Sequence, residues 1–203
     1  MHLYGFIVGT DRGGPPMARI EPIPYEDLDD ESRGRIEAGR ATGMYTTPLP
    51  LQIVAHSKVA LRAMDESYKA QFHCGALDDR LHELVRLRSA QLGACEPCSM
   101  SRKDETVTED QVACLVDPDP SVFSRREVLA LQFVDLLATD HHAVDDDTFR
   151  QLATEFSAEE IVELGWICAS AIGVHRFMHA LDVLGDGEAI VRTSEHGMKR
   201  GHD

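Results

Sequence analysis

The sequence has no uninterrupted apolar run of the roughly 20 residues that a membrane-spanning helix needs. Its first residues, MHLYGFIVGTDRGG, also lack the basic segment followed by a long apolar stretch that marks a secretory signal. Hydrophobic residues make up 43% and charged residues 27% of the 203, as is usual in soluble globular proteins. We therefore expect a cytoplasmic protein that binds no membrane and folds as one domain with its own core.

Basic residues are also scarce. The chain has 20 lysines and arginines against 35 aspartates and glutamates, which gives a formal net charge of −15. A surface of this charge repels the phosphates of nucleic acids and of anionic lipids. We expect neither nucleic acid nor membrane as a partner.

No segment alternates apolar and polar residues with period two, so the sequence predicts an all-α protein. Capping boxes begin two of its helices, one at Ser124 with Glu127 and the other at Ser157 with Glu160. The predicted helices cover residues 25–39, 57–75, 81–93, 98–105, 124–142 and 157–185, with a loop at 46–50.

The breakers Gly13-Gly14-Pro15-Pro16 set the predicted domain limits. We expect residues 1–16 to be a loosely held N-terminal extension, residues 17–190 to form the helical domain, and residues 191–203 to be a polar C-terminal tail. At a shift of 80 residues, LDDRLHEL faces SAEEIVEL, Glu83 pairs with Glu163, and Cys95 pairs with His175. This pattern is explained either by two related helical halves or by chance similarity between amphipathic helices.

The chain has five cysteines, and an odd number in an intracellular protein argues against a structural disulfide framework. Cys74, Cys114 and Cys168 lie in apolar or helical surroundings, and we expect them to behave as small buried hydrophobes. Cys95 and Cys98 form the one pair that is close in sequence. Three interpretations of this pair are open: half of a zinc site, two packed cysteines, or a redox dithiol.

Pro97, between the two cysteines, favours the dithiol. In a continuous helix its ring would collide with the carbonyl of Gly93, so the chain must kink or restart there. Proline is common in the first turn of a new helix, where free backbone N–H groups stabilise a thiolate. A zinc site is disfavoured because no second paired set of ligands completes it.

Two histidines form a second candidate group. His175 and His179 are one helical turn apart, and without an evident third ligand a metal site is disfavoured. The two histidines either form part of the polar lining of a substrate pocket or are ordinary surface or core histidines. Trp166, Phe177 and Met178 are interpreted as core residues.

The spacing of Glu83, eleven residues, Cys95, two residues and Cys98 resembles the signature of AhpD-like alkylhydroperoxidases, within the carboxymuconolactone decarboxylase superfamily. The resemblance covers most of residues 17–185. It implies an AhpD-like helical domain with no cofactor, assembled as a homo-oligomer of three chains or a multiple of three.

The resemblance also implies roles. Cys98 attacks a small peroxide, Cys95 closes the disulfide, Glu83 belongs to a proton relay, and a dithiol protein is the reductant. Arg102 stands where these enzymes have a histidine. If the chain reverses near residues 93–94, Glu83 lies about 15 Å back along one helix and Arg102 about 12 Å along the next, so we expect the two to face each other.

In that geometry Arg102 either holds Cys98 as a thiolate in place of the relay or forms a plain structural pair with Glu83. Two other interpretations stay open. One is a lyase of the carboxymuconolactone decarboxylase type, in which Arg102 and His175 hold the carboxylate of a small lactone. The other is a non-catalytic redox-sensing or scaffold protein.

Overall fold

The computed structural model describes residues 18–73, 75–183 and 191–192. The described chain is all-α, as the sequence predicts, apart from a parallel pair of two-residue strands. The predicted extension 1–16, most of the tail 191–203 and Cys74 lie outside the described residues. The helices are α1 (Asp30–Ala41), α2 (Leu49–Val54), α3 (Lys58–His73), α4 (Asp79–Leu92), α5 (Glu96–Met100), α6 (Glu109–Ala113), α7 (Arg125–Thr139), α8 (Asp146–Leu152) and α9 (Ala158–Ala180).

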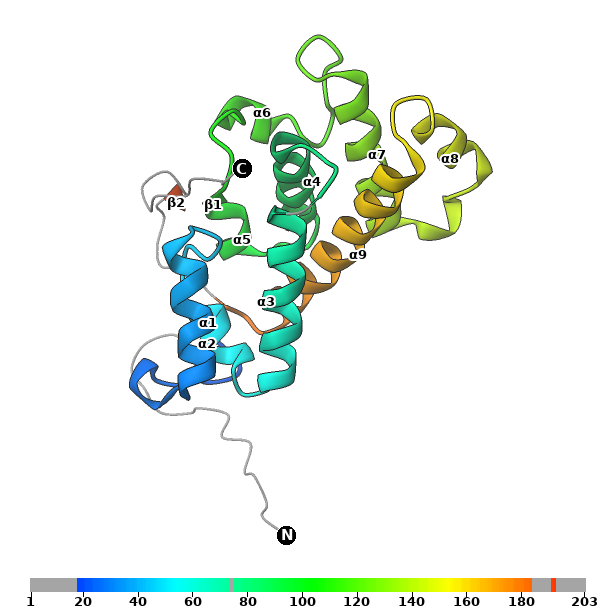
Figure 1. The fold of residues 1–203 in the computed structure, drawn as a ribbon. Coiled ribbons are helices and arrows are strands. Elements are labelled where there is room, and N and C mark those ends of the chain that lie inside the picture. Colours follow the sequence, from blue (N-terminus) through cyan, green and yellow to red (C-terminus); the bar gives the residue numbers. More distant parts are fainter. Residues whose placement is uncertain (1–17, 74, 184–190, 193–203) are drawn as a thin grey trace.

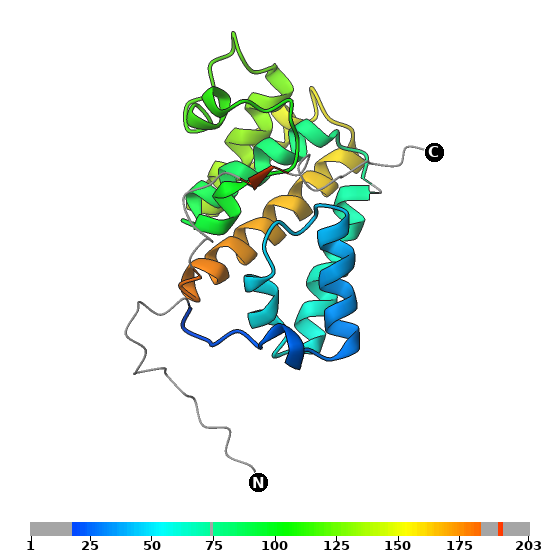
Figure 2. The same cartoon turned by 90° about the vertical axis from the view of Figure 1, so that its left-hand side faces the viewer.

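Helix α4 is central, because it packs against α5, α6, α7 and α9. Helices α1 and α2 pack on α3 and form a second group, which lies on the opposite side of the molecule from α7 and α8 (Figures 1 and 2). One buried cluster fills the space between α1, α2 and α3 and includes Cys95 and Met178. A second cluster joins α4, α7, α8 and α9. The cysteine pair therefore lies beside the α1–α3 core.

Both predicted capping boxes are present. The Ser124 hydroxyl accepts a hydrogen bond from the Glu127 N–H, and the Ser157 hydroxyl accepts one from the Glu160 N–H. In each box the glutamate carboxylate accepts a hydrogen bond from the serine N–H. Other boundaries differ from the prediction. Residues 25–27 form a 3-10 turn before α1, the loop at 46–50 gives way to α2 at Leu49, and the helix expected over 98–105 ends at Met100.

After Met100 the chain becomes extended as β1 (Ser101–Arg102), which pairs in parallel with β2 (Val191–Arg192). The partner strand lies about 90 residues away in sequence, so no local sequence pattern predicts this pairing.

Several buried and exposed positions correct the prediction. Trp166 and Phe177 are 62% and 52% exposed, so they are not core residues, whereas Met178 is buried. Cys114 is exposed and Cys168 is buried, so burial was right for one of them.

Helix α9 is long and apolar enough to cross a membrane by length and composition, a property that it shares with core helices of soluble proteins. Glu163, His175 and Arg176 interrupt its apolar residues. Helices α4 and α9, which the 80-residue shift relates, pack against each other. Their origin by duplication stays a prediction.

The chain reverses between α4 and α5, as predicted. Gly93 ends α4, and a Cβ on it would lie 2.8 Å from the Cβ of His175, so glycine lets α9 approach closely here. Ala94 follows with φ 48°, in the left-handed region that L-residues other than glycine avoid. The turn that positions the cysteines is therefore strained.

We expect Ala94→Gly to raise the free energy of unfolding by about 0.5–1 kcal/mol, because the relieved strain exceeds the entropy that glycine adds to the unfolded chain. Urea unfolding followed by circular dichroism measures this. The control is Ala63→Gly, at an exposed position inside α3, which should lower the free energy by about 1 kcal/mol. Destabilisation by both variants would contradict the assignment of strain to Ala94.

Candidate functional site

Cys95 and Cys98 are joined by a disulfide, with their Cα atoms 5.3 Å apart. Cys95 is the N-cap residue of α5, and Pro97 lies in the first turn, where its missing N–H costs no helical hydrogen bond. Cys95 is 1% exposed and Cys98 is half-buried. At the start of α5, therefore, one cysteine is buried and the other is open on one side.

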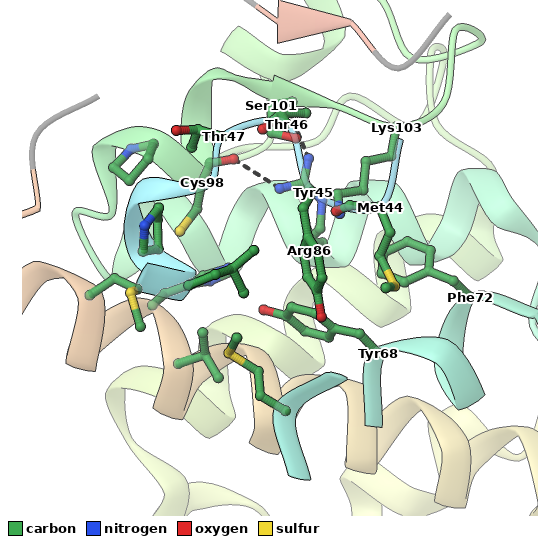
Figure 3. A pocket seen from close by; sticks show the side chains of 17 residues that line it. Met44, Tyr45, Thr46, Thr47, Tyr68, Phe72, Arg86, Cys98, Ser101 and Lys103 are labelled. Carbon is green, nitrogen blue, oxygen red and sulfur yellow. Dashed lines mark hydrogen bonds between the residues drawn. The ribbon is translucent and has the colours of Figure 1, made fainter. Parts of the chain in front are cut away.

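A pocket of about 100 Å³ lies against Cys98. Figure 3 shows the Cys98 side chain projecting into it, with Arg86 and Tyr68 further along. Cys95 does not line it. Most of the wall is apolar or aromatic, from side chains that include Met44, Leu51, Met64, Tyr68, Phe72, Val174 and Met178. The pocket suits a small organic molecule better than a large or highly charged one.

A buried ion pair of α4 holds the backbone around the pocket. The Arg86 guanidinium donates to both carboxylate oxygens of Glu83, at 2.8 and 2.9 Å. It also donates to the carbonyls of Cys98 (2.8 Å) and Ser101 (2.7 Å), while the backbone N–H of Lys103 donates to Glu83. The pair thus holds the backbone of the segment from Cys98 to Lys103 in place.

The charge state of Glu83 follows from these contacts. Burial by itself would raise the pKa of this carboxyl, but the charge and hydrogen bonds of Arg86, with the Lys103 N–H, outweigh it and hold the pKa below its usual range. Both oxygens of Glu83 are engaged, and the side chain is 1% exposed. An ionised carboxylate in this position acts by holding its neighbours in place.

The predicted pair of Glu83 and Arg102 is wrong. Arg102 instead donates to Glu109, at 2.8 and 3.0 Å, and to the carbonyls of Ser99 and Ser101. The reason is that α5 ends at Met100, so Arg102 lies on an extended strand and points away from the side of α4 on which Glu83 lies. Arg102 is not among the residues that line the pocket.

The two predicted histidines are separated. His175 is 2% exposed, lines the pocket, and places Nδ1 3.0 Å from the Ser89 hydroxyl. Burial, with the charge of Arg86, lowers its pKa to about 3, so the ring is neutral near pH 7. His179 is exposed, outside the pocket, with Nδ1 3.1 Å from the Ala94 carbonyl. Among the described residues, no three His, Cys, Asp or Glu side chains form a group that could hold a metal ion.

No protein-family model matches the chain. Over 116 residues the chain is 31% identical to the uncharacterized protein YnjA of Escherichia coli (strain K12), and the match covers 55% of the chain and 64% of YnjA, less than two thirds of that relative. The crystal structure of the alkylhydroperoxidase AhpD core of an uncharacterized peroxidase-related protein from Ralstonia eutropha JMP134 superposes with a TM-score of 0.72 over 89% of this chain and 98% of that one, at 18% identity. The chain has the AhpD-like fold.

Two other solved structures agree. An uncharacterized peroxidase-related protein from Silicibacter sp. TM1040 has a TM-score of 0.72, covering 91% of this chain and 100% of that one at 16% identity. The debrominase Bmp8 has a TM-score of 0.68, covering 86% and 94% at 16% identity. The resemblance to AhpD-like proteins is thus confirmed as a likeness of fold, together with its CxxC pair.

Within this AhpD-like fold, sequence reasoning missed Ser101 and Lys103, which both line the pocket. The Lys103 ammonium donates to the Met44 carbonyl and lies 4.6 Å from the centroid of the Phe72 ring. Loss of water around it and the charge of Arg86 lower the pKa of Lys103 to about 7, against the opposing effect of Glu83. Beyond Cys98, the pocket therefore offers a cation that titrates near neutral pH and a hydroxyl.

Proposed function

We propose that the chain is a dithiol oxidoreductase that reduces a small peroxide, or a small disulfide, through Cys98 and Cys95. One observation carries the proposal: Cys98 of a disulfide-forming pair lines a pocket while its partner Cys95 lies buried behind it. A substrate can reach the first sulfur but not the second. This asymmetry is what an attacking and a resolving cysteine require.

With a peroxide the steps balance as follows. The Cys98 thiolate attacks the outer oxygen, the O–O bond breaks, and the inner oxygen leaves as an alkoxide that takes up a proton to become an alcohol. Cys98 is left as a sulfenic acid. The Cys95 thiol then attacks that sulfur, an S–S bond forms, and water leaves. The net change is two thiols and one hydroperoxide to one disulfide, one alcohol and one water.

The remaining predicted site residues receive roles that fit their contacts. Glu83 acts through Arg86, which donates to the Cys98 carbonyl, so we assign it as a positioning residue and not as a proton relay. Arg102 positions the same segment through the carbonyls of Ser99 and Ser101. His175 is a neutral polar contact for substrate inside the pocket, and His179 supports the turn at Ala94.

The names of the similar structures support this reading, since two of them are described as peroxidase-related. The alternatives are a lyase acting on a small carboxylated lactone and a redox-sensing scaffold without catalysis. A lyase would not need the cysteines. A scaffold would form the disulfide but would not turn over.

The proposal carries further expectations. A dithiol that cycles needs a reducing compartment and a dithiol reductant protein, so we place the chain in the cytoplasm. We also propose a homo-oligomer of three chains or a multiple of three, forming one AhpD-like domain per chain over residues 17–190. In support, α9 leaves Val162, Trp166 and Phe177 exposed, more apolar surface than one helix of an isolated domain usually shows.

The test is a peroxide titration of the reduced protein. We expect one equivalent of hydroperoxide to convert Cys95 and Cys98 to the disulfide, seen by mass spectrometry as the loss of two hydrogens, and dithiothreitol to reverse it. A background of Cys114→Ser removes an exposed thiol that could form bridges between chains. Consumption of peroxide with both thiols still free to alkylation would refute the proposal, and formation of the disulfide without turnover under excess dithiothreitol would favour the scaffold.

A further inference from the structure

Ser101 and Lys103 share one side of an extended segment. Residues two apart on a strand point to the same face, and both side chains line the pocket while Arg102, between them, points to Glu109. Ser101 is 5% exposed, and within the described part of the chain its hydroxyl has no hydrogen-bond partner. A buried hydroxyl without a partner is costly, so its place at a pocket wall points to a ligand that supplies the missing bond.

Lys103 gives the same wall an unbalanced positive charge. The ion pairs of the described residues do not include it; its ammonium contacts the Met44 carbonyl and the rings of Phe72 and Tyr68. Glu83, the buried carboxylate whose charge acts on Lys103 among the described residues, is already bound through both oxygens by Arg86. An ammonium without a carboxylate partner, on the same pocket wall as an unpartnered hydroxyl, offers a compact anion two donors.

We infer that the pocket selects small organic substrates that carry one carboxylate, which accepts hydrogen bonds from the Ser101 hydroxyl and the Lys103 ammonium while the apolar part lies against Tyr68, Phe72 and the methionines. This inference rests on the proposed function for the reactive end of the substrate, which must reach Cys98. The carboxylate end stands on the pocket alone. Neutral substrates of the same shape, and hydrogen peroxide, leave the hydroxyl and the ammonium without their partner.

The experiment compares benzoate with benzamide, two probes of nearly equal shape that differ in charge. It uses the oxidised protein, in which Cys95 and Cys98 are in their disulfide and cannot titrate, and calorimetry gives both dissociation constants. We expect the parent to bind benzoate about tenfold more tightly than benzamide, since a charge-assisted hydrogen bond replaces a neutral one. Lys103→Met should bring the two constants to within about threefold, and Ser101→Ala should weaken benzoate about fivefold.

The matched control is Lys58→Met, which removes an exposed lysine that does not line the pocket and should keep the preference of the parent. Equal binding of the two probes by the parent, or an unchanged preference in Lys103→Met, would overturn the inference. Because binding is measured without turnover, a protein that prefers benzoate but ignores peroxide would refute the proposed function and keep the carboxylate site. A protein that reduces peroxide but binds the two probes equally would keep the proposed function and refute the carboxylate site.

A second measurement on the parent guards against a Lys103 variant that does not fold. Benzoate stays ionised above about pH 6, and the preference for it should fall as the pH rises to about 9, because Lys103, whose pKa burial lowers to about 7, loses its proton. The neighbouring groups keep one charge state over this window: Glu83 and Arg86 charged, and His82, His175, Tyr45 and Tyr68 neutral. A preference independent of pH would show that Lys103 does not hold the carboxylate.

Discussion

Cys98→Ser should abolish peroxide consumption, with a loss on the order of a thousandfold or more, as expected when a covalent nucleophile is removed. The reason is geometric: Cys98 lines the pocket, and no other described cysteine does. Cys95 lies at 1% exposure in the α1–α3 core and cannot replace it. Peroxide consumption by the reduced protein under excess dithiothreitol measures the effect.

Cys95→Ser should fail in a different way. Cys98 would still attack, so one equivalent of peroxide should be consumed per chain, but no second thiol would then close the disulfide. Cys98 should stall as a sulfenic acid and, with more peroxide, oxidise further by one and then two oxygen atoms, which mass spectrometry resolves. Two variants that look alike in the first turnover would contradict the assignment of attacking and resolving roles.

Cys114→Ser provides the matched control for both variants. Its thiol is exposed and lies outside the pocket, so its loss should leave peroxide consumption unchanged. Cys168 is a poorer control, because burial raises its thiol pKa to about 12 and its replacement alters a packed core. If Cys98→Ser consumes peroxide like the parent, the pair is structural and the lyase interpretation gains.

The long helices could be predicted because their signals are local. The capping boxes at Ser124 and Ser157 close hydrogen bonds within three residues, so nothing distant is needed to form them. The reversal at Gly93 and Ala94 could be predicted for the same reason, since Pro97 cannot continue the preceding helix. The resemblance of the cysteine signature then gave the fold.

The pocket wall could not be predicted, because distant contacts decide it. The segment after Met100 has a helical pattern, yet it pairs with a strand about 90 residues later, and the resulting alternation turns Arg102 out and Ser101 and Lys103 in. Helix α2 was missed because six residues that pack on α3 need tertiary contacts to be stable. The observed site thus contains Ser101 and Lys103, the two neighbours of the predicted Arg102, because adjacent residues of an extended segment point to opposite sides.

The second large effect is expected at the Glu83–Arg86 pair. Arg86→Met should lower the free energy of unfolding by about 3–5 kcal/mol, because it leaves a carboxylate that is 1% exposed without its counter-charge. It also removes the donors to the carbonyls of Cys98 and Ser101, so the rate of Cys98 alkylation should change as well. Urea unfolding and iodoacetamide kinetics measure the two effects.

The double variant Glu83→Gln/Arg86→Met is the control, since it removes both charges and keeps an acceptor for the Lys103 N–H. It should recover a large part of the stability lost in Arg86→Met, as is usual when a buried ion pair is replaced by neutral groups. It should not recover the rate of Cys98 alkylation, because the donors to the Cys98 turn are still absent. Equal stability of the single and double variants would mean that the unpaired charge is not what destabilises the single one.

The pH dependence of stability tests whether Arg86 keeps Glu83 ionised. In the parent, the pKa of Glu83 lies below its unfolded value, so its contribution is present at neutral pH and is lost as the pH falls through that range. Without Arg86, burial is the largest remaining influence and raises the pKa of Glu83, so the folded state binds a proton before the unfolded state does. Stability of Arg86→Met relative to the parent should therefore improve as the pH falls from about 7 to about 5. A constant difference between the two proteins over this window would show that Arg86 does not hold Glu83 in its ionised form.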